Sequence, residues 1–149
     1  TGFHADRFVR PLNPVGRNGR TLDTAWAERA TALLAISVPD FPNFFMLNGP
    51  TGPVGNFSLI DIAEAQWKYV DQLIERLRAG NARAVEPTHE AMADYEEKRI
   101  TAAKKTIFGS GCTSWYLDDT GVPASWPWSY QAFVDAMAKP NFEDYRFAA

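Results

Sequence analysis

The segment from Phe44 to Glu64 constrains the fold of this chain more than any other part of the sequence. Its apolar run, Phe44 to Leu47, stops at an Asn-Gly-Pro turn, and further glycines and prolines lead into an amphipathic pattern. This order predicts a short strand buried on both faces, a stiff turn and a helix start. Because a helix start carries unpaired N–H groups with partial positive charge, the turn is a candidate site for an anionic cofactor. The alternative is a purely structural turn, since many strand-to-helix connections bind nothing.

The composition of this turn favours a preformed site. Gly49, Gly52 and Gly55 allow positive φ angles and close approach of the backbone, while Pro50 and Pro53 stiffen the path. A stiff turn suits a binding site better than a flexible linker does.

The longest predicted helix spans residues 58–80. Ser58 can cap its start, Asp61 suits its first turn, and Gly80 can end it. Apolar residues recur at helical spacing and predict the buried stripe: Ala63, Trp67, Val70, Ile74 and Leu77.

Shorter helices are expected at 21–34, from Pro87 to about residue 108, and at 130–139 before Pro140. The charged cluster at 96–99 within the second of these is expected to be a solvated face. Few segments besides 36–38 and 44–47 look like strands, so the sheet neighbours of the apolar run are expected in sequence outside this chain.

The first residues support the same interpretation. The chain opens on Thr1-Gly2-Phe3, without an initiator methionine and within a motif. We therefore expect it to be a piece of a longer protein.

Composition excludes several classes of function. The 149 residues carry a formal net charge of −3 without a basic cluster, which disfavours a nucleic-acid partner. No apolar segment approaches the length of a membrane span and no leader is evident, so a cytoplasmic protein without a membrane partner is expected. Cys112 is the single cysteine, and a semi-buried thiol is a better interpretation than a nucleophile. His4 and His89 are too sparse for a metal site.

With these residues in view, the chain resembles the C-terminal part of class B flavoprotein monooxygenases, the Baeyer–Villiger and 4-hydroxyacetophenone monooxygenase type. The resemblance runs through almost the whole chain, and the order and spacing of its pieces are specific. They are TGFHADRF, GRNGRTLDTAW, VPDFPNFFMLNGPTGPVGN, the helix from Ile60 to Gln66, CTSWYLDDTG and WPWSY.

The resemblance implies an α/β fold. The chain would be a mostly helical C-terminal segment whose few short strands complete the FAD-binding sheet of a flavoprotein with two dinucleotide-binding domains. Residues 1–40 would form the junction and the end of the NADP side. Residues 41–80 would supply the final FAD-sheet strand, the glycine turn and a helix, and residues 81–149 a helical and loop extension.

The resemblance also implies FAD and NADPH as cofactors of the parent protein. The turn would pass the pyrimidine side of the flavin ring, and the helix start would stabilise negative charge on the reduced flavin. Trp115 would lie in a loop that closes over the nicotinamide, although a tryptophan anchored in the core is an equal alternative. The residues implied in cofactor binding are Gly2, Gly49, Pro50, Thr51, Asn56, Ser58, Leu59 and Trp115.

No catalytic residue is expected in this chain. It has neither of the GxGxxG fingerprints that would hold FAD and NADP, and the family's catalytic arginine is expected upstream. The resemblance implies a parent enzyme that uses NADPH and O2 to insert oxygen into a small ketone, with this piece inactive without the missing N-terminal region. The alternatives are an N- or S-hydroxylating flavin monooxygenase and a non-catalytic helical interaction module.

Overall fold

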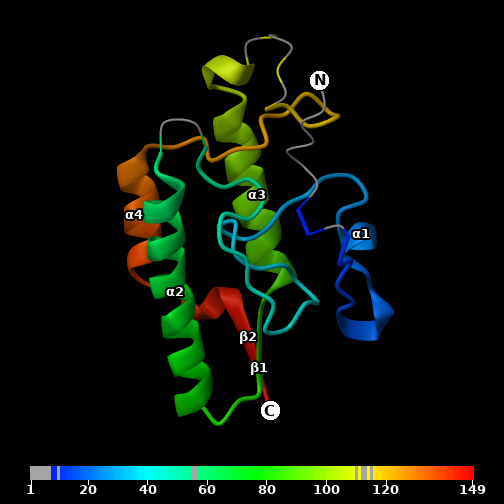
Figure 1. The fold of residues 1–149 in the computed structure, drawn as a ribbon, viewed down its shortest axis with the longest axis vertical. Coiled ribbons are helices and arrows are strands. Elements are labelled where there is room, and N and C mark those ends of the chain that lie inside the picture. Colours follow the sequence, from blue (N-terminus) through cyan, green and yellow to red (C-terminus); the bar gives the residue numbers. More distant parts are fainter. Residues whose placement is uncertain (1–7, 10, 55–56, 110, 112–113, 115) are drawn as a thin grey trace.

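The computed structural model describes residues 8–9, 11–54, 57–109, 111, 114 and 116–149. Its helices and strands follow one another as α1 (Leu22–Ala25), α2 (Leu59–Ala79), β1 (Ala84–Pro87), α3 (His89–Ala103), α4 (Tyr130–Ala138) and β2 (Tyr145–Ala148). Short 3-10 turns occupy Arg17–Gly19, Ile107–Gly109 and Phe142–Asp144. Figure 1 shows α2 and α3 running along the long axis, α4 beside α2, and α1 on the other side of the irregular segments.

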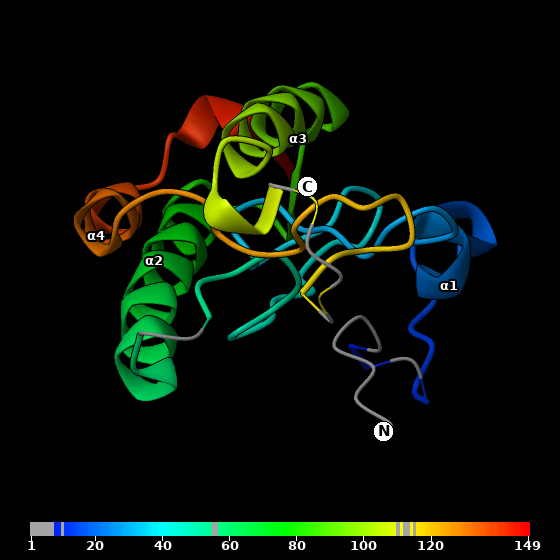
Figure 2. The same ribbon diagram turned by 90° about the horizontal axis from the view of Figure 1, so that it is seen from above.

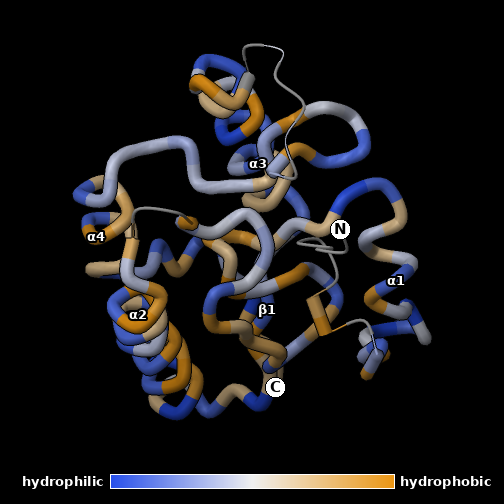
Figure 3. Tube along the Cα trace, turned by 45° about the horizontal axis from the view of Figure 1, so that its top comes forward, coloured by the Kyte–Doolittle hydropathy of each residue, from blue (hydrophilic) through white to orange (hydrophobic). Residues whose placement is uncertain are grey.

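The ends of helix α2 follow from local chemistry and confirm the predicted 58–80 helix. The Ser58 side chain accepts a hydrogen bond from the Asp61 amide at 3.3 Å, and the Gly80 amide donates to Arg76. Polar and apolar residues alternate along α2 in Figure 3, as expected of a helix with one buried face.

The buried face of α2 is rotated from the predicted stripe. Its buried residues are Ile62, Gln66, Tyr69, Val70 and Leu73. Of the predicted stripe, Val70 is fully buried, whereas Trp67 is 56% exposed. The prediction that Trp67 is buried was wrong, because the core contacts the helix face that carries Ile62, Gln66 and Tyr69, and Trp67 lies outside that face.

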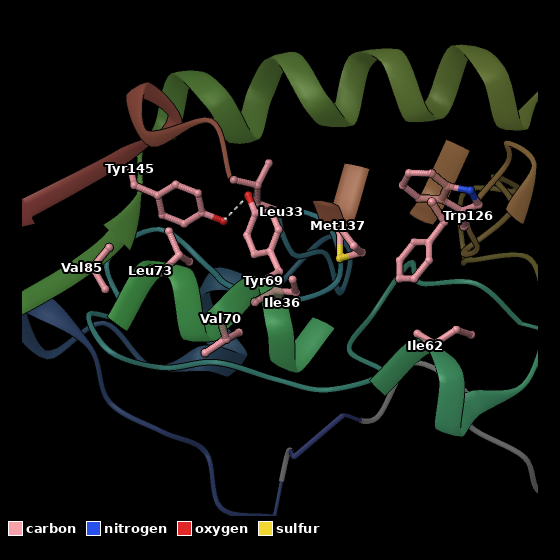
Figure 4. Packing of buried hydrophobic residues seen from close by; sticks show 11 residues of the cluster. Leu33, Ile36, Ile62, Tyr69, Val70, Leu73, Val85, Trp126, Met137 and Tyr145 are labelled. Carbon is pink, nitrogen blue, oxygen red and sulfur yellow. Dashed lines mark hydrogen bonds between the residues drawn. The ribbon is translucent and has the colours of Figure 1, made fainter. Parts of the chain in front are cut away.

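The main core lies between α2, α4 and the β strands (Figure 4). The hydroxyl of Tyr145 donates to that of Tyr69 at 3.2 Å inside it. The cluster comprises Leu33, Ile36, Ile62, Tyr69, Val70, Leu73, Val85, Trp126, Phe133, Met137 and Tyr145. A second cluster, around α1, comprises Leu22, Trp26, Ala30, Ala32, Val38, Phe41 and Met46.

Strands β1 and β2 form an antiparallel pair that the sequence pattern did not reveal. Val85 pairs with Phe147 and Glu86 with Arg146. The Glu86 carboxylate is buried, and both Arg17 and Arg146 donate to it. The pair therefore combines a backbone ladder with a partly buried ion cluster.

The predicted strand at 44–47 does not form within this chain, and the sheet neighbours expected for it in sequence outside the chain are not part of the structure, so the strand stays a prediction. The segment forms one isolated bridge, between Ser37 and Phe45, and the Met46 amide donates to Ile36 at 2.7 Å. Leu47 is 47% exposed. Among the described residues no further strand lies beside it, so neither a ladder nor burial on both faces develops.

Two predicted helices are shorter in the structure. The helix expected at 21–34 ends at Ala25, where Trp26 leaves the helical conformation with φ −107° and ψ 27°, and the chain then makes a tight turn with positive φ at Leu34 and Ala35. The helix expected from Pro87 begins at His89, capped by Thr88, and ends at Ala103. The helix expected at 130–139 is confirmed as α4.

Candidate functional site

The glycine turn at 48–54 is held from two sides. The Asn48 amide donates to the side chain of Gln66 at 2.7 Å, and Gln66 in turn donates to the Leu34 carbonyl at 3.2 Å. Gln66 is buried on α2. One buried amide side chain therefore fixes the turn to the helix and to the 33–37 turn.

Gly49 is needed for close packing of the backbone and not for a left-handed conformation. Its amide donates to the Ala35 carbonyl at 3.1 Å, and a Cβ on Gly49 would lie 2.3 Å from that oxygen. A Cβ on Gly52 would lie 3.1 Å from the Ala35 side chain. The positive φ angles of the turn belong instead to Asn48 and Thr51. The glycines thus allow the turn to approach the 33–37 turn, which is the second of the two roles expected of them.

Thr51 occupies an unusual position in the turn. It has a φ of 65°, is 2% exposed, and donates its hydroxyl to the Pro50 carbonyl at 2.6 Å. A buried β-branched residue in the left-handed region is strained, and such strain persists where the surroundings fix the conformation. The backbone of this turn is therefore set by its neighbours.

The start of α2 meets the same turn. The Asn48 side chain donates to the Leu59 carbonyl at 3.1 Å, while its own oxygen is buried and finds no hydrogen-bond partner among the described residues. Ser58 uses its hydroxyl for the helix cap. The predicted combination of glycine turn and helix start is thus present, with Asn48 as the joining residue.

The turn and the helix start line a cavity of about 550 Å³. Its other walls are the segment after α1, from Trp26 to Ala30, and the segment from Tyr116 to Asp119. Figure 2 shows the 116–124 segment, in yellow to orange, crossing between α3 and α1. Among the predicted site residues, the structure brings together Gly49, Pro50, Thr51 and Leu59.

The remaining predicted site residues do not line this cavity or cannot be placed. Ser58 is at the α2 cap, adjacent to Leu59. Gly2, Asn56 and Trp115 lie outside the described residues, as do His4 and Cys112.

The charged wall of the cavity was not predicted from the sequence. Arg29 Nε lies 2.5 Å from Asp118 Oδ2, and Arg29 also donates to Thr120 at 2.6 Å. Burial raises the pKa of Asp118, but hydrogen bonds from Thr120 and Val122 and the charge of Arg29 outweigh it, so the pKa lies below its ordinary value. The Asp-Asp-Thr-Gly turn was visible in the sequence, but its ionic partner was not.

The expectation of a solvated face at 96–99 is wrong for two of its residues. Arg99 is fully buried, and Glu96 is largely covered. Arg99 donates to Glu96 and to the Pro123 carbonyl at 2.7 Å. The burial of Arg99 could not be predicted from the charged run around it, because the segment that covers it, near Pro123, follows much later in the sequence.

The lining suits a planar ring better than a phosphate. Pro50, Pro53, Val54 and Leu59 supply apolar surface, and the buried Asn48 oxygen is an unused acceptor beside them. Arg29, the basic residue of the described lining, is paired with Asp118. These residues fit the edge of a flavin ring.

The described residues show neither a metal cluster nor a membrane span. No group of three or more histidine, cysteine or acidic residues among them is placed to hold a metal ion. None of the helices they form is long and apolar enough to cross a membrane.

Comparison with known proteins identifies related monooxygenases. No family model matches the chain. An uncharacterized monooxygenase of Mycobacterium tuberculosis is 38% identical over 152 residues, which cover 100% of this chain and 31% of that protein. An FAD-binding monooxygenase of Emericella nidulans is 30% identical over 151 residues, covering 99% of this chain and 25% of that protein. The chain thus spans less than a third of these relatives.

Solved structures give the same result. An oxidized steroid monooxygenase bound to NADP superposes with a TM-score of 0.79 at 28% identity, over 90% of this chain and 26% of that one. The open form of cyclohexanone monooxygenase gives 0.72 at 25% identity, over 91% of this chain and 24% of that one. The chain is therefore similar in sequence to FAD-binding monooxygenases and in fold to steroid and cyclohexanone monooxygenases, and it matches about a quarter to a third of each of these proteins.

Proposed function

We propose that the protein containing this chain is an FAD- and NADPH-dependent monooxygenase that inserts one oxygen atom of O2 into a ketone. The observation that carries the proposal is the cavity formed by the 48–54 turn and the start of α2, in a fold shared with steroid and cyclohexanone monooxygenases. Bound FAD would supply the oxygen chemistry, as cofactors do in flavoenzymes.

The residues of this chain would orient the flavin and exclude water from it. Gly49, Pro50 and Thr51 would form a rigid wall beside the ring, and Leu59 would cover it with apolar surface. The start of α2, fixed by Ser58, would favour negative charge on the ring. The resemblance also implies Gly2, Asn56 and Trp115 in cofactor binding, and these three lie outside the described residues.

This chain would contribute binding surface rather than catalytic groups. Its role requires the rest of the parent protein, which would bring the dinucleotide-binding regions and the catalytic arginine. We therefore expect the chain to be inactive when isolated.

The test uses the full-length protein from its gene. We expect bound flavin to give its visible absorbance, to be bleached by NADPH and to be restored by air. Incubation with a ketone and with a sulfide, followed by product analysis, should give an ester or lactone from the ketone. Sulfoxide without ester would favour an S-hydroxylating enzyme instead. A colourless protein unresponsive to NADPH would refute the proposal and favour a non-catalytic module.

A further inference from the structure

A closed network of charges joins three distant segments at the cavity wall. Arg29 follows α1, Glu96 and Arg99 lie on α3, and Asp118 begins the turn at 117–123. The network runs from Asp118 to Arg29, on to Glu96 and Arg99, and returns to the turn at Pro123. It contains two positive and two negative side chains.

Asp118 organises its own turn. Its Oδ1 accepts hydrogen bonds from the amides of Thr120 and Val122, both at 2.9 Å, and from the Thr120 hydroxyl at 2.7 Å. The turn is closed by the Asp118 amide, which donates to the Val122 carbonyl at 2.9 Å, and Gly121 has a φ of 77°. One carboxylate oxygen therefore shapes the turn, which leaves Oδ2 to face Arg29.

Arg99 anchors the far side of the turn. Its guanidinium donates to both oxygens of Glu96, at 2.8 and 2.6 Å, and to the carbonyl of Pro123. Because the side chain is fully buried, these partners replace the water that would otherwise solvate its charge. Glu96 Oε1 also lies 3.5 Å from Arg29. The turn is thus held at both ends by the same network.

The position of this turn decides the width of the cavity. Residues 117–119 line the cavity together with Arg29, across from the 48–54 turn that is packed on α2. The 48–54 turn is fixed by Gln66 and Ala35, and the Trp126 amide, three residues after the 117–123 turn, donates to the Gly52 carbonyl at 3.0 Å. The 117–123 turn itself is held by the network.

We propose that Arg29 and Asp118 are positioning residues, which hold the 117–123 turn at the distance from the 48–54 turn that the bound nicotinamide and flavin rings require. The assignment rests on the function proposed above for this cavity. The residues act through the turn and do not themselves touch the reacting atoms.

The test measures hydrogen exchange and kinetics of the full-length protein in parallel. In Asp118→Asn and Arg29→Met we expect the amides of residues 116–124 to exchange at least about tenfold faster, as for loss of a partly buried charge pair. The Michaelis constant for NADPH should rise about tenfold while kcat falls less. Arg29→Lys should lie between the native protein and Arg29→Met, because it keeps the charge but loses the links to Thr120 and Glu96.

The matched control is Arg78→Met, which breaks the exposed pair of Arg78 with Glu75 on α2. It should change neither hydrogen exchange at 116–124 nor the kinetics.

Unchanged hydrogen exchange in Asp118→Asn would overturn the network, and faster exchange with an unchanged Michaelis constant would overturn the positioning role. If Arg29→Met does not fold, Arg29→Lys decides the same question. If the full-length protein does not oxidise NADPH, the proposed function is refuted. The hydrogen-exchange measurement would still show whether the network holds the 117–123 turn.

Discussion

At the scale of single residues, the backbone conformation of the turn at 48–54 is set by contacts with neighbouring segments. Gly49 is required by the carbonyl of Ala35, and Asn48 and Thr51 adopt left-handed conformations without being glycine. The requirement for glycine thus arises from contact with another segment, and the local bend of the chain is provided by other residues.

Gly49→Ala should therefore destabilise the protein by about 1 to 3 kcal/mol, because the new Cβ overlaps the Ala35 carbonyl and the backbone must move. Chemical denaturation of the full-length protein measures the change. Gly52→Ala is the graded comparison, since its Cβ would lie 3.1 Å from a side-chain methyl and 3.2 Å from a carbonyl oxygen, against 2.3 Å from an oxygen for Gly49→Ala. Equal losses for both variants would contradict the steric argument.

Asp118 gives a prediction about pH. The pKa of Asp118 in the folded protein is lower than its ordinary value of 3.8. Ionised Asp118 therefore stabilises the fold at pH values above 3.8. This stabilisation is lost as the pH falls through the folded-state pKa. Asp118→Asn should cost about 1 to 3 kcal/mol at pH 7 and progressively less below about pH 4. Unfolding free energies across this pH range test it. Asp119→Asn, which removes the same charge from the exposed neighbour, is the matched control.

At the scale of elements, prediction succeeded where the signals are local. The 58–80 helix was found because Ser58 and Gly80 act within a turn of their own positions. The strand at 44–47 was not confirmed, because a strand needs neighbours that apolar composition cannot supply. Strands β1 and β2 have four residues each and pair across a long separation, so neither has a periodic pattern of its own.

The cap of α2 can be tested separately. Ser58→Ala should reduce stability by about 1 kcal/mol, because the Asp61 amide loses its acceptor and the helix start frays. Ser58→Asp keeps an acceptor and adds favourable charge, so it should retain native stability. Thermal unfolding of both variants measures the difference. A loss of equal size in Ser58→Asp would show that the hydroxyl has another role.

The contact between α2 and β2 predicts sensitivity to alkaline pH. Burial raises the pKa of Tyr145 to about 12 and also raises that of Tyr69. The two neutral phenols therefore stabilise the fold at pH values below 10.0, their ordinary pKa. This stabilisation is lost as the pH rises toward the pKa values of the folded protein. Tyr69→Phe should lose less stability between pH 9 and 11 than the native protein does. Tyr130→Phe, on the more exposed Tyr130, is the control, and its pH profile should follow the native one.

At the scale of the whole molecule, the cavity is assembled from pieces that sequence alone could only partly join. Gly49, Pro50, Thr51 and Leu59 were predicted together because they are neighbours in one motif. Arg29 and Thr120 are 91 residues apart and meet only in the folded chain. The side of the site built from one motif was therefore predictable, and the side built from long-range ion pairs was not.

The isolated chain should not oxidise NADPH, because the described cavity offers binding surface without a group that could hold the dinucleotide phosphates. The measurement compares NADPH consumption by the chain and by the full-length protein, each with added FAD and a ketone. Size-exclusion chromatography and circular dichroism should accompany it, so that an unfolded chain is recognised. Turnover by a folded isolated chain would contradict the expectation that catalytic groups lie elsewhere.

The pairing of β1 with β2 also dictates an order of events during synthesis. Glu86 and Arg146 are separated by 60 residues, so β1 leaves the ribosome long before the strand that completes it. Until Tyr145–Ala148 follow, β1 lacks its paired strand and the Glu86 carboxylate lacks the Arg146 guanidinium. Helices α2, α3 and α4 can form early from local contacts, whereas the main core closes only when Tyr145 reaches Tyr69.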